Sequence, residues 1–336
     1  MIYSIHFLRG IAALFVFIYH VYHIARLYNG MTFPFAEYFH IGVDIFFIIS
    51  GFIMAYIVSK ADVINSVFIL RFIKSRFLRI FPAYFFVTIS IFFVYFYVLG
   101  NPRDFTWISL LKSLLFIPFD SNGDWYPVLG VGWTLNYEVF FYSLIVISMI
   151  FLGKKYYIGV SFLMGSFLTI SLFWEAIEFP FSFWFSPIIL EFLIGMLIGF
   201  IYVGGVREIK FNVFFLSMLL MFIYSFSAEV LHMAIATVIV VFALVLERFR
   251  YVVSFFKFRF FSVLGGISYP LYLIHQPLLS LFGKVFNYFG LFYSGYFVLV
   301  FFIFGFTVSY LLSYAFGRFI DDIVNVTINK YVFKTI

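Results

Sequence analysis

Apolar stretches of about 20 residues recur along almost the whole chain, and they constrain the fold more than any other feature. They fall at residues 5–25, 40–58, 80–99, 133–152, 157–174, 185–203, 211–226, 230–246, 265–283 and 293–316. Only 11% of the residues are charged, against about 25% in a soluble domain. We therefore predict an all-α polytopic membrane protein, a bundle of about ten transmembrane helices that forms one membrane-embedded domain over residues 1–336.

The distribution of Lys and Arg predicts the orientation of these spans. Seventeen of these residues lie near the two ends of the chain or in every second loop, and the opposite loops hold the other four, Arg26, Arg103, Lys112 and Lys284. Positive charge beside membrane spans marks the cytoplasmic side, so both termini are expected in the cytoplasm. The net charge of +6 has the same origin and does not indicate a nucleic-acid partner. The chain has no cysteine, which excludes a thiolate nucleophile and a disulfide.

Arg9 and His20 lie in the first apolar stretch, "LRGIAALFVFIYHV". Eleven helical steps of about 100° and 1.5 Å place both side chains on one face, about 16 Å apart along the axis. Ionisable groups are costly inside a membrane and are functional candidates by default. In the predicted orientation, Arg9 lies at the cytoplasmic end of the span and His20 lies toward its outer half. His23 could share a metal with His20, but no further ligand is evident, so we expect no metal.

Four further segments place polar side chains inside or beside predicted spans. "GVDIFFIISGFIM" contains Asp44, "RFIKSRFLRIFPAY" contains Arg76 and Arg79 on one helical face, and "GVGWTLNYEVFFY" contains Glu138. The first two have a structural alternative, because an acid stabilises a helix N-terminus and arginines anchor the cytoplasmic ends of spans. A carboxylate inside an apolar span, such as Glu138, is expected to face the bundle interior or a wet cavity. In the fourth segment, "LGGISYPLYLIHQPLL", we expect Pro270 to break the helix beside a cavity. The candidate substrate-binding residues are Trp133, Asn136, Tyr142, Ser268, Tyr272 and His275. Gly42 and Gly51 are expected to permit close helix approach.

The five segments, in this order, resemble the acyltransferase 3 family of membrane O-acyltransferases. The segments that carry the resemblance are the Arg9 and His20 pair, "GVDIFFIISGF", "RFLRIFP", "GWTLNYEVFFY" and "ISYPLYLIHQP", and it extends from about residue 4 to 316. One such segment alone would be weak evidence, but five in register with a ten-span pattern are specific. Some family members carry an additional extracytoplasmic hydrolase-like domain, and we expect only the membrane domain here.

The resemblance implies transfer of an acyl group, most often acetyl from acetyl-CoA, to a hydroxyl of a cell-surface or exported glycan. It implies acetyl-CoA as a co-substrate and no permanently bound cofactor. The expected partners are therefore acyl-CoA, a glycan or lipid-linked sugar acceptor, and membrane lipids. The expected location is the bacterial cytoplasmic (inner) membrane.

The candidate residues fit this chemistry. His20 is the expected general base, because an imidazole with a pKa near 6.5 can accept the hydroxyl proton; the alternative is a transient acyl-imidazole nucleophile. Asp44 or Glu138 is expected to orient His20. The coenzyme A phosphates are expected to bind Arg9, Arg76 and Arg79, since guanidinium groups make bidentate phosphate contacts.

Two other functions remain open at this point. A proton-coupled transporter of a sugar or lipid-linked glycan would also use Pro-interrupted helices and buried carboxylates, although we find no internal repeat. A catalytically inactive partner of a glycan polymerase is the second alternative, and it would tolerate loss of His20 and Glu138.

Overall fold

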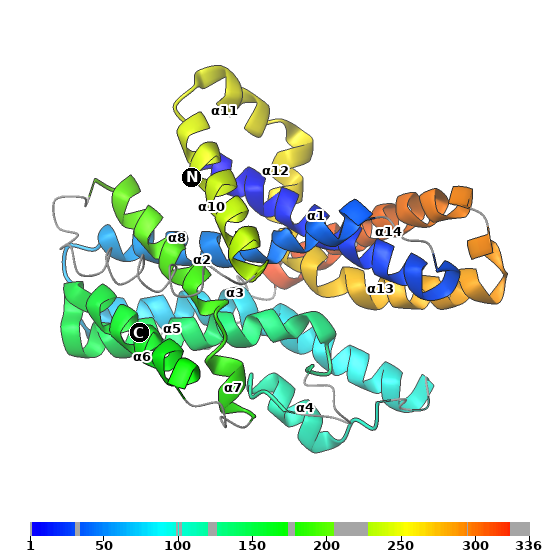
Figure 1. Ribbon diagram of the computed structural model, residues 1–336, viewed down its shortest axis with the longest axis horizontal. Helices are drawn as coiled ribbons and strands as arrows, with labels where there is room; N and C mark the ends of the chain where they lie inside the picture. The colour runs from blue at the N-terminus through cyan, green and yellow to red at the C-terminus, as the bar shows by residue number, and fades with distance from the viewer. Residues whose placement is uncertain are drawn as a thin grey trace.

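The structure is a computed structural model that describes residues 2–30, 34–98, 100, 103–119, 126–173, 179–204, 228–293 and 295–322. Within these ranges every regular element is a helix (Figure 1). The long helices are α1 (Tyr3–Asn29), α2 (Ile41–Ser59), α3 (Ser66–Phe93), α5 (Trp133–Leu152), α6 (Tyr156–Phe173), α8 (Ile189–Tyr202), α10 (Ala228–Leu246), α13 (Ser268–Tyr288) and α14 (Gly295–Asp322). The shorter helices include α4 (Trp107–Leu114), α7 (Phe181–Trp184), α11 (Arg250–Phe256), α12 (Arg259–Gly266) and the 3-10 helix η1 (Pro34–His40).

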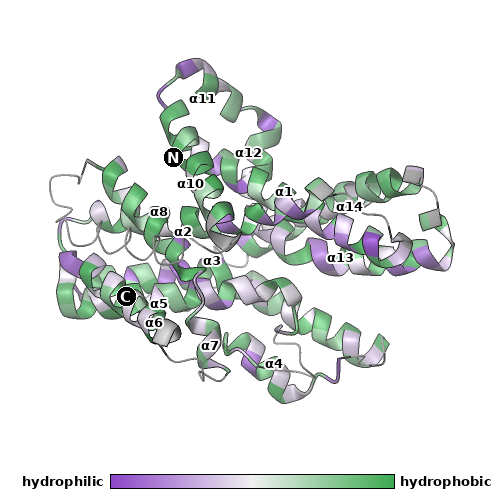
Figure 2. Cartoon of the chain, in the orientation of Figure 1, coloured by the Kyte–Doolittle hydropathy of each residue, from purple (hydrophilic) through white to green (hydrophobic). Residues whose placement is uncertain are grey.

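The helices have the length and apolar composition of a membrane protein, as the hydropathy colouring in Figure 2 shows. In the described ranges, six helical segments are long and apolar enough to cross a membrane, and the bent pair of α10 and α11 adds a seventh if it is counted as one span. One of the six covers both α5 and α6. The predicted spans coincide with helices, except for 211–226, which lies outside the described residues. The all-α membrane class is therefore confirmed, whereas the number of ten spans stays a prediction.

Glycines allow α2 to pack closely against its neighbours. A Cβ built at Gly51 would overlap the Phe192 carbonyl oxygen of α8, and one built at Gly195 would overlap the Ile48 carbonyl oxygen of α2. Gly42 faces α1 in the same way. Small residues permit such backbone approach in membrane helix pairs, so the expectation for Gly42 and Gly51 is confirmed.

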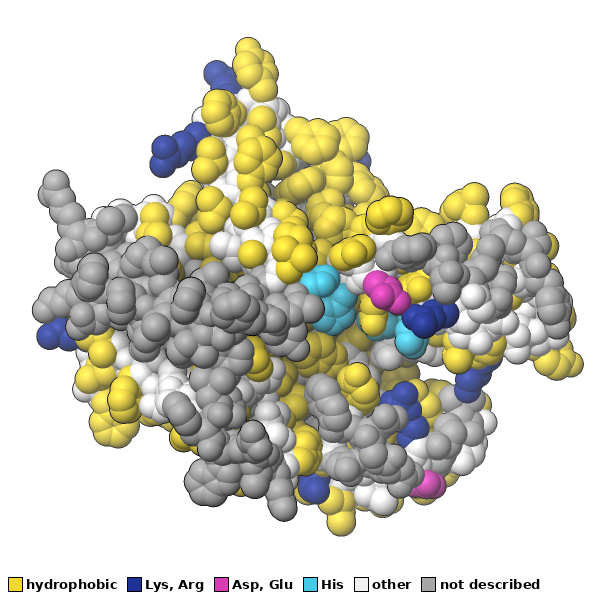
Figure 3. All heavy atoms as spheres, viewed as in Figure 1, with side chains coloured by type: hydrophobic (Ala, Val, Ile, Leu, Met, Phe, Trp, Pro, Cys, Tyr) yellow, Lys and Arg dark blue, Asp and Glu magenta, His cyan; other side chains and the backbone are white. Residues whose placement is uncertain are grey.

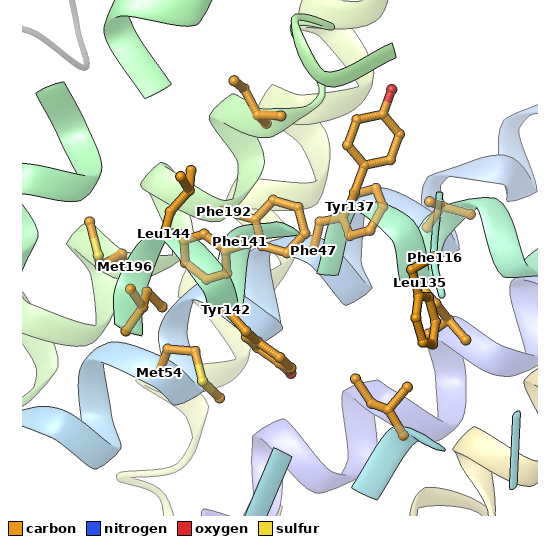
Figure 4. Close-up of a cluster of buried hydrophobic side chains, with 14 of the residues drawn as sticks. Phe47, Met54, Phe116, Leu135, Tyr137, Phe141, Tyr142, Leu144, Phe192 and Met196 are labelled. Carbon is orange, nitrogen blue, oxygen red and sulfur yellow. The ribbon is translucent and has the colours of Figure 1, made fainter. Parts of the chain in front are cut away.

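Aromatic side chains fill the space between α2, α5 and α8 (Figure 4). The ring centroid of Phe192 lies 4.7 Å from that of Phe47 and 4.5 Å from that of Phe141. All three side chains are buried. This cluster fixes α5 beside α2, and it thereby sets the position of the polar residues at the start of α5.

A long-range contact fixes the beginning of α1. The Glu247 carboxylate, just after α10, accepts hydrogen bonds from the backbone N–H groups of Tyr3 and Ser4 at 3.0 and 2.6 Å. The first N–H groups of a helix have no partner within the helix, and the N-terminal end of the helix dipole favours a negative charge. Because the end of α10 meets the start of α1, the two helices run in opposite directions.

Two expectations about helix boundaries are wrong. The basic residues that include Arg76 and Arg79 do not form a loop before a span at 80–99, because α3 begins at Ser66 and continues through Pro82. Pro270 does not break the interior of a helix: it lies in the first turn of α13, where the backbone N–H has no intrahelical partner. The proline inside α13 is Pro277.

Candidate active site

Two histidines from opposite parts of the sequence meet between α1 and α13. The His275 Nε2 atom lies 3.2 Å from the His20 Nδ1 atom, and the two rings are nearly perpendicular. His275 is fully buried. It lies in the third turn of α13, and α13 packs along α1, which brings the two side chains together.

The backbone carbonyls around this histidine pair assign the ring protons. His275 Nδ1 lies 2.9 Å from the Leu271 carbonyl oxygen, which can only accept, so Nδ1 donates and Nε2 carries the lone pair in the neutral ring. His20 Nδ1 lies 2.9 Å from the Val16 carbonyl oxygen and also faces His275 Nε2. Both of these neighbouring atoms are acceptors. With both rings neutral, His20 Nδ1 carries its proton, and His20 Nε2 has a free lone pair with which to accept another.

A narrow cavity lies nearer the beginning of α1. Its volume is about 50 Å³, and five helices line it through Arg9 (α1), Ser50 (α2), Arg79 (α3), Glu138 (α5) and Tyr272 (α13). The two guanidinium groups come from helices that are distant in sequence. In this cavity they face a single described carboxylate, that of Glu138, which leaves an excess of positive charge.

Hydrogen bonds hold Glu138 in place. Its Oε1 atom accepts from the Ser50 hydroxyl at 3.0 Å and from the Tyr142 hydroxyl. The Arg76 guanidinium lies 5.9 Å from the centre of the Tyr142 ring, within the range of a cation–π contact. The predicted arginines Arg9, Arg76 and Arg79 therefore gather around one polar cluster with Glu138 and Tyr142.

Three predicted substrate-binding residues lie outside the lining of the arginine cavity. The buried Ser268 hydroxyl donates to the Gly265 carbonyl oxygen at 2.8 Å, across the break between α12 and α13. Trp133 packs edge-on against Phe47. Asn136 is buried in α5. None of these three lines the arginine cavity, whereas the predicted Tyr272 does.

A second, larger cavity lies toward the other end of α1. Its volume is about 400 Å³, and it is lined by the second half of α1, η1, and residues at or beside the starts of α2, α8 and α10. Asp44 lies here, in the first turn of α2. In the described part of the chain, no hydrogen bond joins His20 to Asp44 or Glu138, and His275 is its side-chain partner. No group of three or more candidate ligands in these residues could hold a metal.

Sequence reasoning missed two features of this region. The contact between His20 and His275 joins residues 255 positions apart, and no local pattern encodes it. His232, near the start of α10, lines the larger cavity beside Asp44, and no motif around it indicated this. Glu191 also lines the cavity, and its place at the start of an apolar span already marked it as a candidate.

The fold and this region define a helical membrane protein with arginines and a histidine pair in its interior. The family model described as an acyltransferase domain matches residues 2–318, so the chain belongs to the acyltransferase 3 family. This confirms the resemblance seen in the sequence, and it supports an acyltransferase function.

Two curated proteins are similar to parts of this chain. The exopolysaccharide production protein ExoZ of Rhizobium meliloti (strain 1021) is 35% identical over 169 residues, which are 49% of this chain and 51% of ExoZ. Protein 2 in the picA locus of Rhizobium radiobacter is 31% identical over 124 residues, which are 33% of this chain and 61% of that protein. The chain thus matches about half of ExoZ and less than two thirds of the second relative. No solved structure matches significantly.

Proposed function

We propose that this protein transfers an acyl group to a hydroxyl of a cell-surface or exported glycan. The proposed acyl group is acetyl, and the proposed donor is acetyl-CoA. The observation that carries the proposal is the order of groups along α1. The cluster of arginines and Glu138 comes first, at Arg9, and the histidine pair lies about 16 Å further along the helix. This order suits a reaction whose phosphate-bearing donor and hydroxyl acceptor approach from opposite sides. The printed name of ExoZ, an exopolysaccharide production protein, supports a polysaccharide acceptor.

We further propose that ten helices span the bacterial cytoplasmic (inner) membrane, with both termini in the cytoplasm. The arginine cavity then lies toward the cytoplasm, where acyl-CoA is available. The larger cavity lies toward the outer side, together with the starts of α2, α8 and α10. The proposed partners are acyl-CoA, a glycan or lipid-linked sugar, and membrane lipids.

In this proposal Arg9, Arg76 and Arg79 hold the phosphates of the donor, which is a co-substrate and not a resident cofactor. Arginine matches phosphate oxygens with two parallel hydrogen bonds. The cavity volume of about 50 Å³ has room for only a few water molecules. Binding of the pantetheine arm therefore requires the side chains between α2 and α5 to move apart.

His20 acts as the general base through its Nε2 atom. The acceptor hydroxyl gives its proton to Nε2 while its oxygen attacks the thioester carbonyl, which forms a new C–O bond. The resulting imidazolium is stabilised by His275 Nε2, which accepts from His20 Nδ1. The tetrahedral intermediate then collapses, the C–S bond breaks, and the leaving coenzyme A thiolate takes the proton from His20 Nε2, which restores the neutral base.

The mass of the host's surface glycans tests this proposal. Cells with the intact gene, without it, and with His20→Ala at equal expression are compared, and His6→Ala on the same helix is the matched control. We expect the deletion and His20→Ala to lose one acetyl mass per acceptor site, and His6→Ala to retain it. No mass change in the deletion strain would contradict a glycan acceptor and favour the transporter alternative. Loss in the deletion alone would keep the transfer but remove His20 from the chemistry.

A further inference from the structure

The larger cavity is acidic in its interior. At its rim the Arg26 guanidinium and the Glu37 carboxylate form an exposed ion pair at 2.9 Å, so these two charges largely cancel. Deeper in the cavity lie Asp44 and Glu191, which are only 6% and 3% exposed. Histidines also line the wall, and an imidazole can exchange hydrogen bonds with a hydroxyl group. The cavity therefore disfavours an anionic ligand.

One oxygen of Asp44, a residue that lines this cavity, is an unused acceptor. Its Oδ2 atom is buried and has no hydrogen-bond partner among the residues that the structure describes. A buried carboxylate oxygen without a donor is costly, and native proteins almost always satisfy such groups. A ligand that carries hydroxyl groups would supply the missing donor.

The cavity also adjoins the proposed base. Tyr19, which lines the cavity, packs edge-on against His20 with ring centroids 5.3 Å apart. His23 and His40 line the same cavity and lie close enough to His20 to interact with it electrostatically. Figure 3 shows histidine, acidic and basic side chains lying close together on the face in view. A hydroxyl bound here would lie beside the general base.

We propose that this cavity is the acceptor site and that its occupant is an uncharged, polyhydroxyl sugar residue, not an anionic one such as a uronate or a phosphorylated sugar. The inference rests on the acyl transfer proposed above. A volume of about 400 Å³ suits a ligand of the size of one or two sugar rings. The tyrosines at the wall offer apolar ring faces for such rings, and the two buried carboxylates accept from their hydroxyls.

The test uses the purified full chain in lipid nanodiscs, labelled acetyl-CoA, and surface polysaccharide isolated from the gene-deletion strain as the acceptor. Initial rates are compared for the wild type, Asp44→Asn and Glu191→Gln. The matched control is Asp62→Asn, which makes the same change at an exposed loop position between α2 and α3. We expect the acceptor KM to rise about tenfold in the two cavity variants, because a hydrogen bond to a charged oxygen becomes a weaker one to a neutral amide oxygen. The acetyl-CoA KM should stay within about twofold of the wild-type value.

The label must also be located in the wild-type product by mass spectrometry, which does not depend on any variant folding. Label on an uncharged sugar residue supports the inference, and label on a uronate or phosphorylated residue overturns it. An unchanged acceptor KM in both cavity variants, or a loss confined to kcat, also overturns it. If the wild type transfers no label to the polysaccharide, the proposed function itself fails.

Discussion

The contact between His20 and His275 leads to a quantitative prediction for His275→Phe. This change removes the Nε2 acceptor but keeps a ring in a fully buried site. His20 Nδ1 still has the Val16 carbonyl oxygen at 2.9 Å, so the ring keeps its tautomer. A neutral hydrogen bond of this kind contributes about 0.5–1.5 kcal/mol, whereas one to a charged group contributes about 1.5–3 kcal/mol. In the proposed mechanism the larger value applies in the transition state, where His20 becomes an imidazolium.

Only the difference between the two values, about 1–1.5 kcal/mol, changes kcat. We therefore expect kcat to fall by about 5- to 13-fold in His275→Phe, with little change in the acetyl-CoA KM. His20→Ala should lose more, about 10²- to 10⁴-fold, because the base itself is absent. Both values come from initial rates of acetyl transfer by purified protein in nanodiscs, after equal folding has been checked by thermal unfolding.

Two controls separate hydrogen bonding from packing. Phe17→Leu alters the buried ring that packs beside His275 with centroids 6.2 Å apart, yet it leaves the contact between the histidines intact, so its kcat should stay near the wild-type value. His275→Gln retains an acceptor oxygen and should recover part of the lost rate. The reasoning is refuted if His275→Phe lowers kcat by less than about threefold, or if Phe17→Leu lowers it equally.

Three further predictions concern other parts of the molecule. Arg79→Lys keeps the positive charge but loses bidentate phosphate contacts. The acetyl-CoA KM measured in rate assays should therefore rise about tenfold. An unchanged KM would exclude Arg79 from donor binding. Gly195→Val places a side chain against the Ile48 carbonyl oxygen and should lower the free energy of unfolding by about 1–3 kcal/mol. Equal melting temperatures of the variant and the wild type would contradict this. Glu247→Ala removes the partner of the Tyr3 N–H, with an expected loss of about 0.5–2 kcal/mol, measured by the same unfolding assay.

Much of the fold could be predicted because membrane helices leave a local signal. A run of about 20 apolar residues is a property of consecutive positions, and the described helices fall where those runs lie. Helix boundaries were less predictable. Arg76 and Arg79 precede the predicted span at 80–99, yet both lie inside α3, which begins at Ser66 and continues through Pro82. Their side chains join the polar cluster around Glu138.

The candidate site could be predicted only in part. Arg9 and His20 lie on one helix, so their spacing alone places them on one face. Glu138 was expected to face a polar interior, and it does so in the arginine cavity. Which groups it meets there could not be predicted, because its hydrogen bonds with Ser50 and its proximity to Arg79 depend on how α2, α3 and α5 pack.

The sequence by itself determined the membrane class and the family, and it supplied the candidate residues for the proposed chemistry, because hydropathy and local motifs depend on neighbouring positions. Only the tertiary structure decided the pairing of these residues. It placed His275 against His20, assigned Asp44 to a second cavity, and gave Ser268 a structural hydrogen bond. The physical reason is that side-chain packing and glycine contacts between distant helices fix these distances, and such contacts leave no periodic trace along the chain.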